Sequence, residues 1–221
     1  MSSLETKAPN LTVTMLYSGF LDEAITAYST SPSLIEQSKY FKKINFTNLL
    51  TKEAVLEKRL VFLAEWEKYS NAILSEMYNL TGLAFQRNII DIYIVRAVPR
   101  TFSNPIIIFA GMSVDRFLQT LTHELVHILI RENLGISGLQ KLDSILEELF
   151  PQETKLTRDH VLLYAILHEI YAKVFPNTDR FEKEIEWSKN YSTNEYTVAI
   201  ELGSHYGYKK IIEDVIKEMS S

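Results

Sequence analysis

The 221 residues include 23 Lys and Arg against 28 Asp and Glu, which gives a net charge of only −5, and 46% of them are hydrophobic. A chain of this size and balance can bury one sizeable core, and its charge favours no nucleic-acid partner. It has no cysteine, which excludes disulfides and thiolate metal ligands. It lacks an apolar run of about 20 residues and a signal-peptide pattern, so we expect a cytoplasmic protein with no membrane partner.

The first part of the chain is expected to hold one strand and several helices. Residues 1–10 are polar and are predicted to be frayed, with a single domain over residues 11–221. From Leu11 to Tyr17, β-branched and apolar residues alternate in the manner of a strand, and two short helices are expected after it. A long helix is predicted from Thr51 to Leu80, where Thr51 suits the amino-terminal turn and Gly82 suits the stop.

Two strands and a buried helix are predicted in the middle of the chain. Ile89 to Val95 has the pattern of a strand, and Ile106 to Ala110 is a second one, continuously apolar and therefore buried. The two are expected to pair as a small sheet. From Ser113 to Leu134 the pattern is helical, with Ser113 as the N-cap and Gly135 as the glycine that ends the helix.

Helices are expected in the rest of the chain. Gly138 to Phe150 is predicted to be a short helix, and Asp159 to Phe175 a strongly apolar one that ends before Pro176. Two or three more helices fill Asp179 to Met219. This order predicts an α+β fold, a mostly helical single domain with a small β-sheet that precedes the helix at residues 113–134.

The sequence His123-Glu124-Leu125-Val126-His127 lies on this central helix. Two histidines four residues apart lie about 40° apart around a helix axis, so that both rings can bind one ion. Glu124 lies about 100° around from His123, where its carboxylate can reach a metal-activated water without binding the metal. The pattern therefore predicts a Zn2+ site with Glu124 as the general base, which passes a proton from water to the leaving amine.

The rest of the central helix supports a buried site. Thr120 and Arg131 share a polar wedge of about 100° with His123, Glu124 and His127. Apolar residues cover most of the remaining circumference: Phe117, Leu118, Leu121, Leu125, Val126, Ile128, Leu129 and Ile130. These residues predict a buried helix with one polar slot. The competing interpretation is an ordinary amphipathic helix whose polar stripe faces solvent.

A catalytic zinc ion usually has three protein ligands, so a third is expected from the apolar helix at residues 159–175. His160 is preferred, in the first turn of that helix. Glu169 points about 180° away from it, and Glu169 and His168 are the alternatives. Tyr164, one turn after His160, is a candidate hydrogen-bond donor to the oxyanion of a tetrahedral intermediate. Its competing interpretation is a core tyrosine with its hydroxyl at the surface.

The motif and its setting resemble the zincin metallopeptidases, in which His-Glu-x-x-His lies on a helix that follows a small sheet. The resemblance covers roughly Ile89 to Phe175. The chain also resembles an uncharacterised prokaryotic family of predicted zinc peptidases, in the helix Leu121 to His127, in the later helix with Asp159-His160 and Glu169-Ile170-Tyr171, and in the tail Tyr196 to Tyr208.

This closer likeness implies that His160 is the third ligand. The sequence departs from the family's pattern at Tyr164, where a second histidine is expected, and at Asp159, which replaces asparagine. Zincins with a glutamate ligand in a following helix would instead favour Glu169. Zincins with a histidine shortly after the motif are excluded, because no histidine lies between His127 and His160.

The predicted function is that of a zinc-dependent metallopeptidase that hydrolyses a peptide or amide bond of a peptide or protein substrate. Such a substrate could add to an exposed edge of the small sheet by β-augmentation. One alternative is a non-catalytic regulatory or binding protein that retains a zincin scaffold. Another is a helical interaction module whose motif is coincidental. The sequence carries no signal for an oligomeric state.

Overall fold

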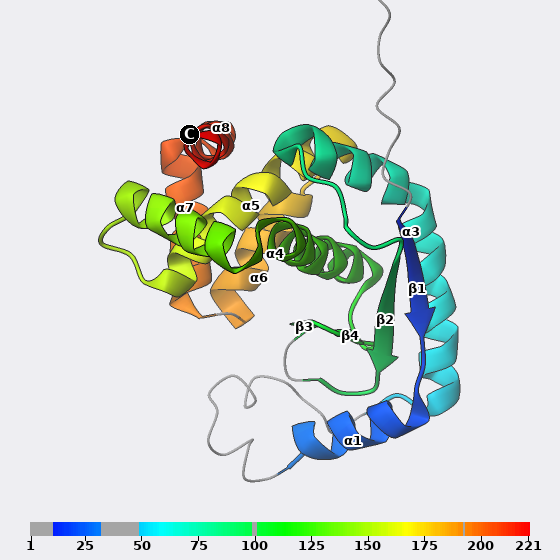
Figure 1. The fold of residues 1–221 in the computed structure, drawn as a ribbon. Helices are drawn as coiled ribbons and strands as arrows, with labels where there is room; N and C mark the ends of the chain where they lie inside the picture. Colours follow the sequence, from blue (N-terminus) through cyan, green and yellow to red (C-terminus); the bar gives the residue numbers. More distant parts are fainter. Residues whose placement is uncertain (1–10, 32–48, 99–100, 192) are drawn as a thin grey trace, which may run out of the picture.

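A computed structural model describes residues 11–31, 49–98, 101–191 and 193–221 (Figure 1). The frayed segment expected at residues 1–10 lies outside these residues. Of the two short helices expected before Thr51, α1 (Gly19–Ser29) is present, whereas residues 32–48 lie outside the described part. In the described chain, none of the helices combines the length and the apolar character that crossing a bilayer requires.

Four strands form one mixed sheet in the order β1-β2-β4-β3. β1 (Thr12–Leu16), β2 (Ile89–Val95) and β4 (Ile106–Phe109) run parallel, and β3 (Phe102–Ser103) pairs antiparallel with β4. The three longer strands were predicted within one or two residues, and β2 and β4 pair as expected. β3 was not predicted, because two residues are too few for an alternating pattern.

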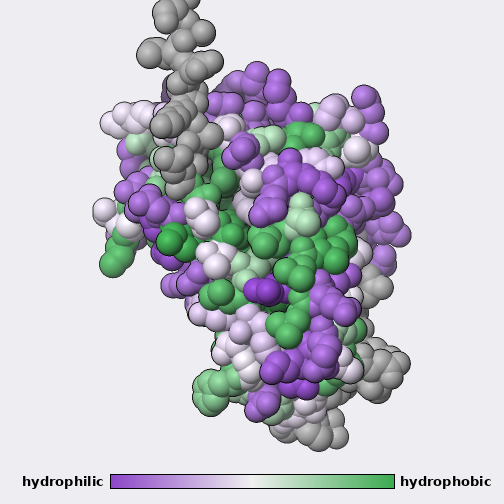
Figure 2. All heavy atoms as spheres, turned by 90° about the vertical axis from the view of Figure 1, so that its right-hand side faces the viewer, coloured by the Kyte–Doolittle hydropathy of each residue, from purple (hydrophilic) through white to green (hydrophobic). Residues whose placement is uncertain are grey.

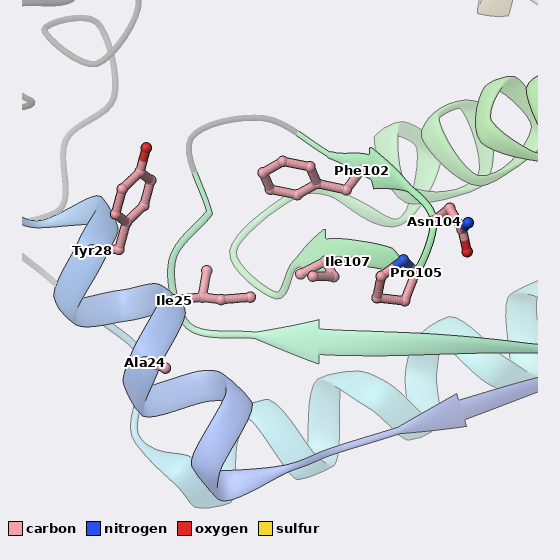
Figure 3. A pocket seen from close by; sticks show the side chains of 7 residues that line it. All are labelled: Ala24, Ile25, Tyr28, Phe102, Asn104, Pro105 and Ile107. Atoms are coloured by element: carbon pink, nitrogen blue, oxygen red, sulfur yellow. The ribbon is translucent and has the colours of Figure 1, made fainter.

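The two faces of the sheet pack against different helices. Ile106 and Ile108 of β4 point into the main core, whereas Ile107 packs with Val95 in a small cluster beneath α1. A shallow hollow opens between α1 and the β3–β4 turn, lined mainly by apolar side chains (Figure 3). It includes Ile107 and Phe102, so it lies on the α1 face of the sheet.

α3 (Lys52–Thr81) runs along the side of the molecule, beside β1 (Figure 1). Its predicted ends are confirmed, because the Thr51 hydroxyl accepts a hydrogen bond from the Ala54 amide at 3.2 Å and Gly82 takes a left-handed conformation with φ 69°. Its buried row packs on the sheet and on the central helices: Val55, Phe62, Trp66, Ile73, Leu74 and Met77. Figure 2 views the molecule from this side, where hydrophobic patches lie among hydrophilic ones. Leu60 and Val61 of α3 are exposed.

α4 (Val114–Leu149) begins at the predicted N-cap, Ser113, whose hydroxyl accepts a hydrogen bond from the Arg116 amide at 3.1 Å. The predicted end of the first helix at Gly135 is confirmed, because the backbone there is non-helical (φ 57°, ψ −166°) and divides α4 into two helical segments. Only glycine adopts a positive φ at little cost. The second segment begins directly after Gly135 and not at Gly138 as predicted, so a kink without a loop joins the two segments.

α5 (Lys155–Val174) begins four residues earlier than predicted, because the Thr154 hydroxyl accepts a hydrogen bond from the Thr157 amide at 3.2 Å and caps the helix. His160 consequently lies in the second turn and not in the first. Three helices complete the chain: α6 (Arg180–Tyr191), α7 (Asn194–Tyr206) and α8 (Tyr208–Ser220). With the four-stranded sheet, they make a mostly helical α+β structure.

Candidate metal centre

The rotation of α4 about its axis is set by its apolar residues. Leu121 and Leu125 are fully buried in the core, and in a helix the residues between such positions must face another side. His123 and His127 lie on that side, each half-buried, and point toward α5. Glu124 is 8% exposed. The polar slot predicted for this helix therefore lies between helices and not in open solvent.

α5 brings a third histidine to this pair. The ring centroid of His160 is 5.6 Å from that of His123 and 5.4 Å from that of His127, and the two α4 rings are 4.9 Å apart. One ring nitrogen of each histidine lies within 4.8 Å of the others. The three preferred candidate ligands therefore share one site, although His160 lies about 30 residues after His127 in the sequence.

A backbone hydrogen bond fixes the orientation of His160. Its Nδ1 lies 2.8 Å from the carbonyl oxygen of Leu156, one turn earlier on α5. Because a carbonyl can only accept, Nδ1 carries the proton and donates it, which leaves the lone pair on Nε2. Metal-binding histidines commonly have such a second hydrogen bond, since it fixes the tautomer and the plane of the ring.

The surroundings keep all three imidazoles neutral. Burial, together with the smaller effects of the neighbouring His160 and Arg131, lowers the pKa of His127 to about 3. Burial also lowers the pKa of His160, and it holds that of His123 well below the usual value, aided by His127 and His160. A neutral imidazole is the form that binds a metal ion, so the site can accept a cation at neutral pH without first losing protons.

Two tyrosine rings lie beside the histidines. Tyr164 of α5 is 1% exposed, and its ring centroid is 5.9 Å from that of His123. Tyr196 of α7 lies closer, with its ring centroid 4.2 Å from that of His160. Tyr196 was not predicted as a site residue. It was named only as the start of the tail, Tyr196 to Tyr208, that resembles the family of predicted zinc peptidases. Helical periodicity places residues around one helix, but it does not tell which residue of a later helix packs against it.

The two alternative third ligands lie elsewhere. The His168 ring stacks on Tyr208 with centroids 4.1 Å apart and contacts the edge of Phe181 at 4.9 Å. Its Nδ1 is hydrogen-bonded to the Glu169 carboxylate at 2.9 Å. These contacts join α5 to α6 and α8. Among the described residues, the cluster of possible metal ligands contains neither His168 nor Glu169.

A buried ion pair borders the site and was not predicted. Arg116 in the first turn of α4 pairs with Glu184 of α6, which is 3% exposed. The guanidinium also lies 3.5 Å from the centre of the Trp187 ring. The Arg116 charge contributes to the low pKa of His123, and Glu184 contributes, after burial, to the raised pKa of Tyr164. The pair thus fixes α6 against α4 next to the histidines.

Neither protein-family models, nor curated proteins, nor solved structures give a match to this chain.

Proposed function

We propose that the protein is a zinc-dependent metallopeptidase with a zincin-like arrangement, in which His123, His127 and His160 hold the metal. The observation that carries the proposal is the convergence of three neutral histidines from α4 and α5. Imidazole nitrogens suit Zn2+, and three protein ligands leave a position open for chemistry. The Nδ1 hydrogen bond of His160 to the backbone supports the same assignment, because it leaves Nε2 to bind the ion.

When bound, zinc supplies a Lewis acid that polarises the substrate carbonyl and makes a nearby water more acidic. Glu124 lies next to His123 on the same turn of α4 and is the proposed general base. Its carboxylate takes a proton from water as the water oxygen bonds to the carbonyl carbon. The carbon–nitrogen bond then breaks, and Glu124 delivers that proton to the leaving nitrogen. The products are a carboxylic acid and an amine.

The edge of the sheet offers a place for an extended peptide. Within the described chain, β3 is an outer strand that pairs only with β4, and β3 also contacts α4. Ser103 is in register with Ile106, whose side chain faces the main core, so Ser103 lies on the α4 face of the sheet. We propose that a substrate peptide adds to this edge through backbone hydrogen bonds. The hollow beneath α1 lies on the opposite face and takes no part.

A second candidate function is a metal-binding regulatory protein without hydrolytic activity. The observation that favours it is the contact of Tyr196 with His160, which places α7 against one of the proposed ligands. A site covered by its own carboxyl-terminal helices would bind a metal ion without admitting a peptide.

Substitution of the proposed base distinguishes the two functions. The zinc-loaded chain should cleave a mixture of fluorogenic peptides, and Glu124→Gln should abolish cleavage while zinc content stays the same. Glu148→Gln is the matched control, since Glu148 lies exposed on the same helix, and this variant should cleave like the wild type. Zinc binding without any cleavage by the wild type would favour the regulatory protein. Cleavage that persists in Glu124→Gln would show that another group acts as the base.

A further inference from the structure

The two tyrosines beside the histidines differ in their exposure to solvent. Tyr164 is 1% exposed, and its ring lies among His123, His160 and Tyr196, with centroids 5.9, 6.2 and 6.4 Å away. A substrate could reach its hydroxyl only if neighbouring side chains or helices moved. Tyr196 is partly exposed, although it makes the closer contact with a proposed ligand, at 4.2 Å from His160.

Contacts of α7 with α5 and with Tyr208 hold Tyr196 in position. It lies in the first turn of α7, the helix that makes the most extensive contact with α5. The next turn is anchored by the buried side chains of Ala199 and Ile200, and the Tyr208 hydroxyl donates a hydrogen bond to the Ile200 carbonyl at 3.1 Å. Residues 193–198, in contrast, keep partial or full exposure. Tyr196 thus lies on a helix that is anchored by buried residues, while its own side chain stays partly exposed.

We propose that Tyr196 contacts the substrate, and that its hydroxyl donates a hydrogen bond to the oxygen of the scissile carbonyl as that oxygen becomes negatively charged. This is the role that the sequence suggested for Tyr164, and the inference rests on the proposed peptidase function. Tyr164 is then a positioning residue, whose ring supports His123 and His160. The contact of α7 with His160 then adds a catalytic hydroxyl to the active site and does not block the entry of substrate.

The expected effects follow from the charge that develops on the carbonyl oxygen. A hydrogen bond to that oxygen is stronger in the transition state than in the bound substrate, so its loss lowers kcat more than it raises KM. Removal of one such donor typically lowers kcat by about 100-fold or more. Phenylalanine at position 196 keeps the ring and its contact with His160 and removes only the hydroxyl.

The test compares three zinc-loaded, full-length variants with the wild type: Tyr196→Phe, Tyr164→Phe and Tyr206→Phe. Tyr206 lies on the same helix as Tyr196 and donates to Asp214 at 3.2 Å, so it serves as the matched control. Each variant is assayed for zinc content, thermal unfolding, and kcat and KM on a fluorogenic peptide. Its affinity for a dipeptide in which a tetrahedral phosphonamidate replaces the peptide bond is measured by calorimetry.

Tyr196→Phe should keep one zinc ion, lose about 100-fold in kcat with KM within about threefold, and bind the phosphonamidate about tenfold more weakly. Tyr206→Phe should remain within about threefold of the wild type in kcat, KM and phosphonamidate affinity, and Tyr164→Phe, which keeps its ring, should lose much less kcat than Tyr196→Phe. Wild-type kinetics and affinity in Tyr196→Phe, or the same losses in Tyr164→Phe instead, would overturn the inference and leave the peptidase in place. A wild-type chain that binds zinc but neither cleaves the peptide nor binds the phosphonamidate overturns the proposed function, and this inference with it.

Discussion

The His160 side chain is restrained on two sides of its ring. Its Nδ1 is hydrogen-bonded to the Leu156 carbonyl at 2.8 Å, and its face lies against Tyr196. A ligand that is ordered before the metal arrives loses little rotational freedom on binding, so more of the interaction energy remains for the ion. In the metal-free chain these three imidazoles, one buried and two half-buried, stay neutral within the fold, so protonation opposes folding.

This burial predicts a pH-dependent stability of the metal-free protein. The folded-state pKa of His127 is about 3 against 6.5 for an ordinary histidine, and those of His123 and His160 are also lowered. Below pH 6.5 the unfolded chain therefore binds more protons than the folded one, so stability decreases as the pH falls. His127 alone should account for about 2 kcal/mol between pH 6.5 and pH 5.

Urea unfolding of the chelator-treated protein at pH 7.5, 6.5 and 5 measures this effect. The free energy of unfolding should fall mainly between pH 6.5 and 5, and the fall should be smaller in His127→Ala. His205→Ala removes an exposed histidine and should leave the pH profile as it is. An unfolding free energy that does not change between pH 6.5 and 5 would show that the fold does not lower the pKa values of these histidines.

Among the helices, α5, α7 and α8 are joined by one close contact. A Cβ atom added at Gly203 of α7 would lie 2.2 Å from the Tyr208 ring, and that ring stacks on His168 of α5. Gly203→Ala should therefore displace Tyr208 and destabilise the protein by about 1–3 kcal/mol. Gly19→Ala is the control, because its nearest neighbour would be 4.0 Å away. Equal thermal unfolding midpoints in both variants would contradict this packing.

The elements that could be predicted are those whose signals are local. Thr51, Gly82 and Ser113 mark helix ends through hydrogen bonds or backbone angles of their own, and the alternating residues of β1 and β2 identify strands. The start of α5 was missed because Thr154 is followed by a lysine, which is unusual in a first turn. The helix end at Gly135 was predicted, but the second helical segment follows it without the expected loop.

In the candidate site, too, only the residues with a local signal in the sequence could be predicted. His123, Glu124 and His127 are adjacent through the helical repeat alone, so their spacing is visible in the sequence. His160 was chosen by helical periodicity and family likeness, and the structure places it beside them. Tyr196 and the Arg116–Glu184 pair come from tertiary packing. No local pattern encodes such contacts, because they depend on how α6 and α7 lie across α4 and α5.

At the scale of the whole molecule, the sheet and the candidate site occupy different regions (Figure 1). The sheet lies between α1 and the inner helices, with its apolar hollow on the α1 side (Figure 3). The histidines lie among α4, α5 and α7, where helix packing is most extensive. The proposed metal would therefore lie among the most extensively packed helices, and the β3 edge, which is proposed to bind a peptide, lies beside α4.

The central claim is that three histidines hold one zinc ion, and zinc content measured by elemental mass spectrometry tests it most directly. The metal-replete wild type should contain about one zinc per chain. His123→Ala and His160→Ala should lose it, whereas Glu169→Ala should retain it, because Glu169 lies with His168 away from the cluster. A folded wild type without zinc would contradict the account, and so would zinc that is retained in His160→Ala but lost in Glu169→Ala.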